Sequence, residues 1–207
     1  PRLDPSETAL HQIEQLGYKR ADVRHLIVTH LDLDHAGGLP DFPEAQVHVY
    51  RPEHDAAMAR ATLMERERYR PQHFSHQPRW ATYDLKTGGE HWLGFECVRE
   101  LDGLPPEILM VPLVGHTRGH CAVAVRAERN WLLHCGDAYF YRDEISPESP
   151  YCTPGLATFQ RLVAVDDAAR RHNQERLREL DRDHSAEVRI FSAHDPAELA
   201  THTGGIA

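Results

Sequence analysis

Apolar residues along this chain recur at two kinds of spacing, and the two kinds alternate from one end to the other. Helical spacing predicts amphipathic helices over residues 6–16, 52–69 and 156–180, the first capped by Ser6 and ended by Gly17. Short apolar runs predict β-strands over residues 25–29, 46–50, 80–84, 95–100, 108–114, 121–126, 131–134 and 188–191. This alternation is typical of an α/β fold, and we expect a single domain over residues 1–207.

Composition and charge narrow the classes of function. Hydrophobic residues make up 41% of the chain and charged residues 27%, a balance typical of a globular protein. The formal net charge of −9 argues against binding to nucleic acid or to an anionic membrane surface, since both carry negative charge. No apolar run approaches the roughly 20 residues of a membrane-spanning helix, and the first residues lack the apolar core of a signal peptide. We therefore expect a cytoplasmic protein that acts on a small molecule, with homodimer formation left open.

Histidine is the residue type that points to chemistry, because the chain contains 16 histidines. The densest group lies directly after the predicted strand 25–29, where four potential ligands alternate with leucines: His30, Asp32, Asp34 and His35. This alternation suits a loop that would turn polar groups into a cavity and pack the leucines behind them. Imidazole nitrogens together with carboxylate oxygens suit zinc, manganese or iron. For this segment alone, the alternative is a charged surface loop.

Three later segments repeat the same arrangement of an apolar strand followed by a polar residue. His116 lies in the glycine-flanked loop after strand 108–114, Asp137 follows strand 131–134, and His194 follows strand 188–191. Each of them alone is more simply a packed or capping residue, although a buried aspartate without a partner would be costly. Strand ends of this kind can converge on one cleft, so the four segments together predict one metal site.

The order and separation of these residues resemble the metallo-β-lactamase superfamily, and the segments LIVTHLDLDHAGG and VPLVGHTRGH look most like its N-acyl homoserine lactonase branch. The resemblance implies a four-layered αβ/βα sandwich with the active site at one edge of the two sheets. It also implies two divalent metal ions, with zinc the first expectation. The implied ligands are His30, Asp32 and His116 for the first ion, Asp34, His35 and His194 for the second, and Asp137 as a bridge between them.

Three departures from the family pattern change this picture. Asp32 stands where the family has a second histidine, and its hard oxygen donor moves the expected metal toward manganese or iron. Lactonases place a tyrosine three residues after the bridging aspartate, whereas Phe140 occupies that position here, between Tyr139 and Tyr141. Family members usually begin with two or three strands that are not visible here, so we expect N-terminal strands to be missing from this chain.

The function implied by the resemblance is cleavage of an ester, lactone or thioester by a metal-bound hydroxide. The candidate catalytic residues, for orienting the nucleophile, moving protons and stabilising the oxyanion, are Asp34, Asp137 and Tyr139. Apolar side chains in and after the predicted helix 52–69 either line an acyl pocket or simply pack on the core: Met58, Leu63, Met64 and Phe74. Two alternatives stay open. One is an iron-dependent oxidoreductase of the same fold, of the persulfide dioxygenase or di-iron oxygen reductase type, and the other is a degenerate member that only binds.

Overall fold

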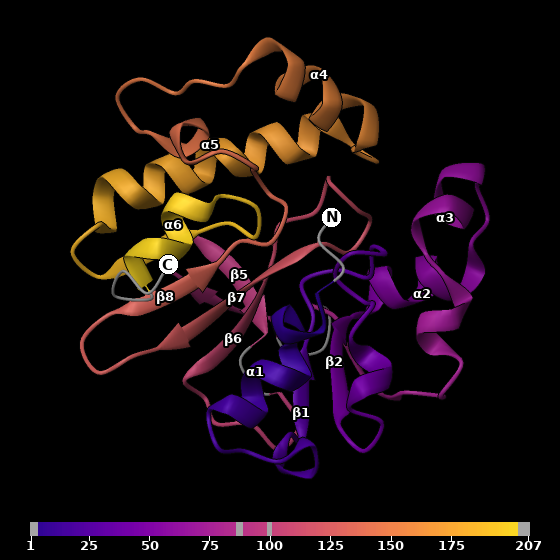
Figure 1. Ribbon diagram of the computed structural model, residues 1–207. Coiled ribbons are helices and arrows are strands. Elements are labelled where there is room, and N and C mark those ends of the chain that lie inside the picture. Colours follow the sequence, from indigo (N-terminus) through magenta and orange to yellow (C-terminus); the bar gives the residue numbers. More distant parts are fainter. Residues whose placement is uncertain (1–3, 86–88, 99–100, 203–207) are drawn as a thin grey trace.

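The computed structural model describes residues 4–85, 89–98 and 101–202, whose strands form two β-sheets (Figure 1). The smaller sheet is parallel and contains β1 (His25–Ile27), β2 (Gln46–Tyr50) and β3 (Arg79–Tyr83) in that order. In the larger sheet all neighbours are antiparallel except β8 and β9, which run parallel. Its six strands lie in chain order: β4 (Gly89–Trp92), β5 (Phe95–Val98), β6 (Ile108–Pro112), β7 (Cys121–Arg126), β8 (Trp131–His134) and β9 (Val188–Phe191).

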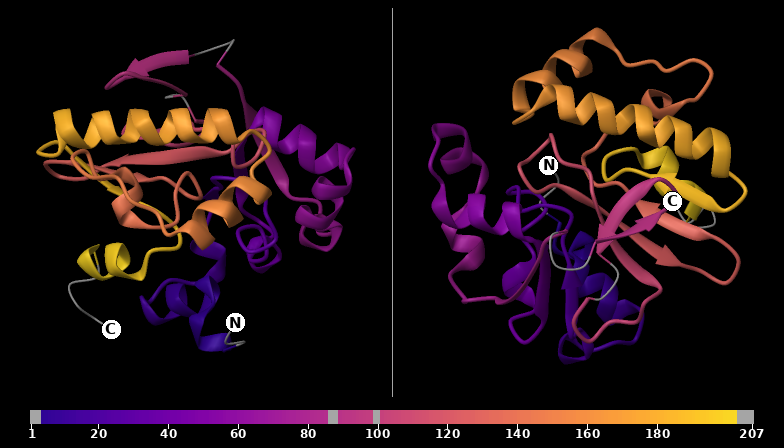
Figure 2. Two further views of the ribbon diagram at one scale, coloured as in Figure 1. Left: turned by 90° about the horizontal axis from the view of Figure 1, so that it is seen from above. Right: turned by 180° about the vertical axis from the view of Figure 1, so that it is seen from behind.

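Helices connect these strands and lie on the outer sides of the two sheets. Figure 2 shows the long helix α5 running along one side of the larger sheet, away from α2 and α3. None of the described helices is long and apolar enough to cross a membrane. The α-helices of the described residues are α1 (Ala9–Gln15), α2 (Arg51–Ala59), α3 (Leu63–Arg68), α4 (Pro154–Val163), α5 (Asp167–His184) and α6 (Pro196–His202).

The side chains of β6 alternate between the two faces of the larger sheet, and their contacts show the order of the helix and sheet layers. Leu109 and Val111 face one side of the larger sheet and share an apolar cluster with Leu177 of α5. Met110, between them in sequence, belongs instead to the cluster that includes Ile27 of the smaller sheet. Because successive strand residues point to opposite faces, β6 lies between α5 and the smaller sheet. A third cluster packs α2 on the remaining face of the smaller sheet through Val47, Val49, Ala56 and Ala57. The order helix, sheet, sheet, helix confirms the predicted sandwich.

Two predicted helices are each divided into two, and local capping explains both divisions. Arg60 ends α2 in the left-handed region with φ 43°, and Thr62 then caps α3 by accepting a hydrogen bond from the Glu65 N–H at 3.2 Å. The predicted helix 156–180 is interrupted after α4, where the Asp166 carboxylate caps α5 through the Ala169 N–H at 3.0 Å. These caps could not be predicted from the sequence, because apolar spacing continues across both breaks.

Three other differences from the predicted elements are smaller. Thr8, not Ser6, caps α1 by accepting a hydrogen bond from the His11 N–H at 3.3 Å. The sequence analysis missed α6 and also β4, which consists mostly of exposed residues. The predicted strand 95–100 is observed up to Val98, and its last two positions lie outside the described residues.

Candidate metal centre

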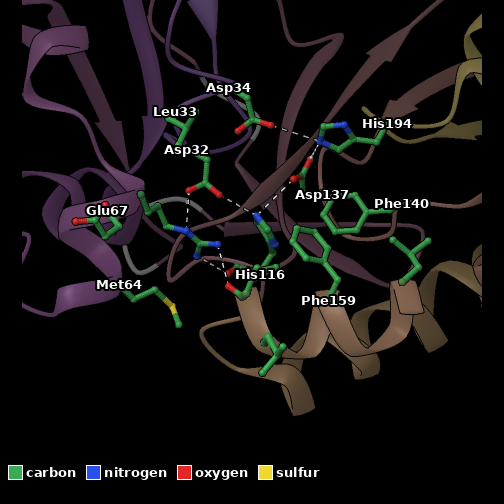
Figure 3. Close-up of a pocket in the computed structure, with 14 residues that line it drawn as sticks. Asp32, Leu33, Asp34, Met64, Glu67, His116, Asp137, Phe140, Phe159 and His194 are labelled. Atoms are coloured by element: carbon green, nitrogen blue, oxygen red, sulfur yellow. Dashed lines mark hydrogen bonds and ion pairs between the residues drawn. The ribbon is translucent and has the colours of Figure 1, made fainter. Parts of the chain in front are cut away.

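The predicted ligand residues come together where the two sheets meet. Residues 30–35 follow β1 of the smaller sheet, whereas the other three ligand positions follow β6, β8 and β9 of the larger sheet. Figure 3 shows side chains from both sources pointing toward one another at the wall of a cavity: Asp32, Asp34, His116, Asp137 and His194. The ligand-type atoms form three overlapping groups, each within 4.8 Å: His30, His35 and Asp137; His30, Asp32 and His116; and Asp34, His35 and His194.

One group is almost completely buried. Asp32 Oδ2 lies 3.0 Å from His116 Nε2 and 3.6 Å from His30 Nε2, so two imidazole nitrogens and one carboxylate oxygen converge. The His30 side chain is fully buried, and those of Asp32 and His116 are 12% and 4% exposed. Two nitrogen donors and one oxygen donor at this separation could hold one divalent cation.

The group formed by Asp34, His35 and His194 lies nearer to solvent. Asp34 Oδ2 is 3.7 Å from His35 Nε2 and 3.8 Å from His194 Nε2. The side chains of Asp34 and His194 are 54% and 40% exposed, whereas that of His35 is 14% exposed. A cation held here would therefore be open to the cavity on one side.

Asp137 lies between the two groups. Its Oδ1 is 3.2 Å from His35 Nε2 and 3.3 Å from His194 Nε2. Its Oδ2 is 3.4 Å from His116 Nε2 and 3.7 Å from His30 Nε2. Each oxygen of this buried carboxylate faces a different group, the arrangement required for a bridging ligand.

Buried polar atoms that lack a hydrogen-bond partner indicate whether these residues suit a metal ion. Among the described residues, His30 Nε2, His35 Nε2 and Asp137 Oδ1 are buried without a hydrogen-bond partner. Buried polar atoms without partners are costly, and here they point toward one another. A cation at their centre would satisfy all three, so the donor set fits divalent metal ions.

The ionisation state of the Asp137 carboxylate also favours metal binding. Burial would raise the pKa of Asp137, yet the neighbouring imidazoles of His194, His35 and His30 hold it below its usual range. Burial lowers the pKa of His116 and outweighs the contact with Asp32, which raises it. An ionised aspartate beside neutral imidazole is the protonation state that metal binding requires.

A buried glutamate that the sequence analysis missed joins the two ligand loops. Glu53, near the start of α2, accepts hydrogen bonds from the Leu31 N–H and the Gly119 N–H, both at 3.0 Å. The Tyr69 hydroxyl donates to the same carboxylate at 3.1 Å. In the sequence, an acidic residue in the first turn of a helix is simply a favourable partner of the helix dipole, and therefore gave no signal.

His120 lies behind the ligands. One ring nitrogen is 2.9 Å from the Leu113 carbonyl, and the other accepts a hydrogen bond from the Asp137 N–H at 2.9 Å. It therefore helps to fix the backbone at the bridging position.

Arg68 is a second contact that the sequence analysis missed. Its Nε lies 3.0 Å from Asp32 Oδ1. Its other two nitrogens donate to the carbonyls of His116 and Val163, at 2.8 Å and 2.9 Å. Arg68 is 8% exposed although it ends a helix rich in charged residues, which from the sequence looks like a solvated face.

Tyr139 does not reach the cavity, contrary to the expectation from the sequence. It is fully buried, and its hydroxyl donates to Glu198 Oε1 of α6 at 2.8 Å. The other oxygen of Glu198 accepts hydrogen bonds from Ser192, two residues before His194. Tyr139 therefore helps to anchor the segment that carries His194, while its neighbour Phe140 lines the cavity.

The cavity beside the ligands has a volume of about 600 Å³. Its polar end contains the ligand-type residues, and its remaining wall is largely apolar (Figure 3). Of the four apolar residues that the sequence suggested for such a wall, Met64 lines the cavity, whereas Met58, Leu63 and Phe74 do not. Most of the wall comes from α4, which contributes Leu156, Phe159, Leu162 and Val163.

Comparison with known proteins places this arrangement in a family. The metallo-beta-lactamase superfamily model matches residues 3–194. A probable metallo-hydrolase from Mycobacterium tuberculosis is 42% identical over 197 residues, covering 95% of this chain and 62% of that protein. An N-acyl homoserine lactonase from Bacillus thuringiensis is 25% identical over 170 residues, covering 80% and 60%. The chain thus spans about three fifths of the length of these relatives.

Solved structures agree on the fold. An N-acyl homoserine lactone hydrolase, with N-hexanoyl-L-homoserine bound at its catalytic metal center, superposes with a TM-score of 0.70. The two chains are 20% identical, and the match covers 97% of this chain and 67% of the other. A probable metal-dependent hydrolase from Staphylococcus aureus gives a TM-score of 0.67 at 16% identity, covering 90% and 60%. With its two sheets, its convergent histidines and aspartates and the match over residues 3–194, this chain belongs to the metallo-beta-lactamase superfamily.

Proposed function

We propose that this chain is a metal-dependent hydrolase that binds two divalent metal ions and cleaves an ester, lactone or thioester of a small molecule. The observation that carries the proposal is the position of Asp137, whose two oxygens face two different groups of ligand atoms. The names of the relatives, probable metallo-hydrolase and N-acyl homoserine lactonase, support the same class of reaction.

The proposed ligands divide between the two groups. His30, Asp32 and His116 would hold the buried ion, and Asp34, His35 and His194 the ion nearer to solvent, with Asp137 shared. Ions bound there would supply two things, a water acidified to near neutral pH and a Lewis acid for a carbonyl oxygen. Zinc is the first expectation from this donor set, and the carboxylate of Asp32 also admits manganese or iron.

Two carboxylates are proposed to move protons. Asp137 faces both groups of ligand atoms, so it can orient a water molecule held between them and accept its proton. Asp34 is the more exposed of the two, with its side chain 54% exposed at the cavity mouth. Solvent and substrate can reach it, so we assign to it the transfer of the proton released by that water to the leaving group.

The apolar wall sets the substrate class within this proposal. Phe159 and Leu162 of α4 and Met64 of α3 lie beside the ligand end of one cavity, and all three are exposed to it. Apolar surface of this kind binds hydrocarbon, and the ligand end binds the reacting carbonyl. An ester or lactone with an acyl chain has both parts.

The first experiment is elemental analysis of the purified full-length protein, together with hydrolysis assays on lactones and esters of increasing acyl length. We expect about two zinc or manganese ions per chain and hydrolysis that favours longer chains, both lost in Asp137→Ala. Asp55→Ala is the matched control, because the Asp55 side chain is 65% exposed. Bound iron without hydrolysis would favour the iron-dependent oxidoreductase, and a protein without metal would contradict the proposal.

A further inference from the structure

Arg68 is buried at the wall of the cavity, where its guanidinium group makes one ion pair and two hydrogen bonds. Nε pairs with Asp32 Oδ1 at 3.0 Å, and the two terminal nitrogens donate to the carbonyls of His116 and Val163. The Arg68 side chain is only 7% exposed. It is therefore not available as a cation for an anionic substrate, and its positive charge acts on the residues around it.

Asp32 divides its two oxygens between two kinds of partner. Oδ1 faces Arg68, whereas Oδ2 faces the nitrogens of His116 and His30 at 3.0 Å and 3.6 Å. Rotation of this carboxylate would break the pairing with Arg68, because the guanidinium group is fixed by the carbonyls of His116, in a ligand loop, and of Val163, at the end of α4. Arg68 thus holds Oδ2 toward the histidines of the buried group.

The pair also changes the charge of the buried group. Asp32 alone adds one negative charge to a set of ligands that already contains Asp34 and Asp137. Arg68 adds one positive charge at 3.0 Å, in a region from which water is largely excluded. The charge of Asp32 and Arg68 taken together equals that of a neutral imidazole, the group that the family pattern has at position 32.

We propose that Asp32 and Arg68 act as one neutral ligand unit for the buried metal ion, in which Asp32 supplies the donor atom and Arg68 is a positioning residue that balances its charge. This inference rests on the proposed function, because it assumes that the ligand groups bind metal. It requires that neither member of the pair can be replaced by a residue of different charge without a change in its partner.

The test is a charge-swap series measured by zinc content and zinc affinity, with no need for an activity assay. The full-length protein is stripped of metal, and zinc affinity is measured by competition with a chromophoric chelator. Asp32→His leaves the Arg68 charge unbalanced beside the ion, so we expect zinc affinity to fall by about tenfold or more. Asp32→His/Arg68→Gln removes that charge and keeps a donor for the two carbonyls, so most of the affinity should return.

Asp32→His/Arg68→Lys is the matched control, because lysine keeps the charge but loses the fork of donors. We expect this variant to bind zinc as weakly as Asp32→His. Circular dichroism checks that each variant is folded. If the Asp32→His variants do not fold, the same comparison is made between Asp32→Asn and Asp32→Asn/Arg68→Gln, where removal of the unbalanced charge should again raise the affinity.

The outcomes separate this inference from the proposed function. A double variant Asp32→His/Arg68→Gln that binds zinc no better than Asp32→His would overturn the neutral unit and leave Arg68 as a brace for the two carbonyls. Equal recovery in the lysine and glutamine variants would overturn it too, because charge would then not matter. An original protein that binds no metal would instead contradict the proposed function itself.

Discussion

Glu53 carries a buried negative charge that three donors from different parts of the chain stabilise. Its side chain is fully buried, and its oxygens accept hydrogen bonds from the N–H groups of Leu31 and Gly119 and from the Tyr69 hydroxyl. These donors belong to both ligand loops and to the end of α3. A single carboxylate therefore fixes the distance between the loop that carries His30 and the loop that carries His116.

We predict that Glu53→Gln lowers the free energy of unfolding by about 2–3 kcal/mol, because the amide group would turn a donor toward a buried N–H. Zinc affinity should fall as well, since the two loops would no longer be held together. Urea denaturation of the metal-free protein measures the first effect, and chelator competition measures the second. The exposed Glu14→Gln is the control, and an equal effect of both substitutions would contradict the role of Glu53.

Individual residues of the site differ in whether their positions could be predicted from the sequence. The positions of His30, His116, Asp137 and His194 could be predicted because each follows an apolar strand, and strand ends converge in such folds. Glu53 and Arg68 could not be predicted in this way. Both lie on short helices among other charged residues, and nothing in the spacing separates a buried charge from a solvated one.

At the scale of elements, β1, β2 and β3 are linked by a row of polar side chains as well as by backbone pairing. His48 Nδ1 is 2.8 Å from the Tyr83 hydroxyl, and its Nε2 is 2.9 Å from His25 Nδ1. The Tyr83 oxygen also accepts the Asp102 N–H at 2.9 Å, so the hydroxyl hydrogen is free to point to His48. Neutral His48 can then donate to His25, which orients the whole row.

A lower pH should weaken the hydrogen bonds that link His25, His48 and Tyr83. Burial and the charge of His25 lower the pKa of His48 to about 4 from its usual 6.5, against the opposing charge of Asp102. Between these two pH values the unfolded chain binds more protons than the folded chain, so stability falls as the pH falls. From pH 7 to pH 5 this one group should cost about 2 kcal/mol of unfolding free energy.

The measurement is urea denaturation at both pH values for the protein and for His48→Gln. The variant should be less stable at pH 7, because it loses the Tyr83 contact, yet its stability should depend less on pH. His91→Gln serves as the control, since His91 is exposed on β4. An unchanged pH dependence in His48→Gln would mean that His48 is not the group that titrates.

The elements also differ in how far the sequence determines them. Strands such as Gln46–Tyr50 and Val188–Phe191 are observed as predicted, because a short apolar run is typical of a buried β-strand. Helix ends were harder to predict from the sequence. Thr62 and Asp166 cap new helices at points where the helical spacing of apolar residues continues without a break. The division of the strands of the described residues into a sheet of three and a sheet of six depends on contacts between distant segments, which one sequence does not reveal.

For the whole molecule, the metal centre joins the two sheets. Residues 30–35 extend from the smaller sheet, whereas His116, Asp137 and His194 extend from the larger sheet. Away from this centre, the two sheets also pack through an apolar cluster that contains Met110 and Ile27. Metal ions bound by ligands from both sheets would therefore act as a link between the two halves of the sandwich.

Removal of metal should consequently lower the melting temperature of the whole chain. Each ion present at about 100 times its dissociation constant stabilises the folded state by about 3 kcal/mol, so the two ions together should raise the melting temperature by roughly 10–20 °C for a chain of this size. Differential scanning calorimetry before and after chelation measures the shift, and added zinc should reverse it. Hydrogen exchange should locate the loosened backbone in residues 30–35 and 115–120, with α5 protected, because only the loops depend on the ions. If chelation instead left both the melting temperature and the exchange of these loops unchanged, the two sheets would be held together by their apolar core alone.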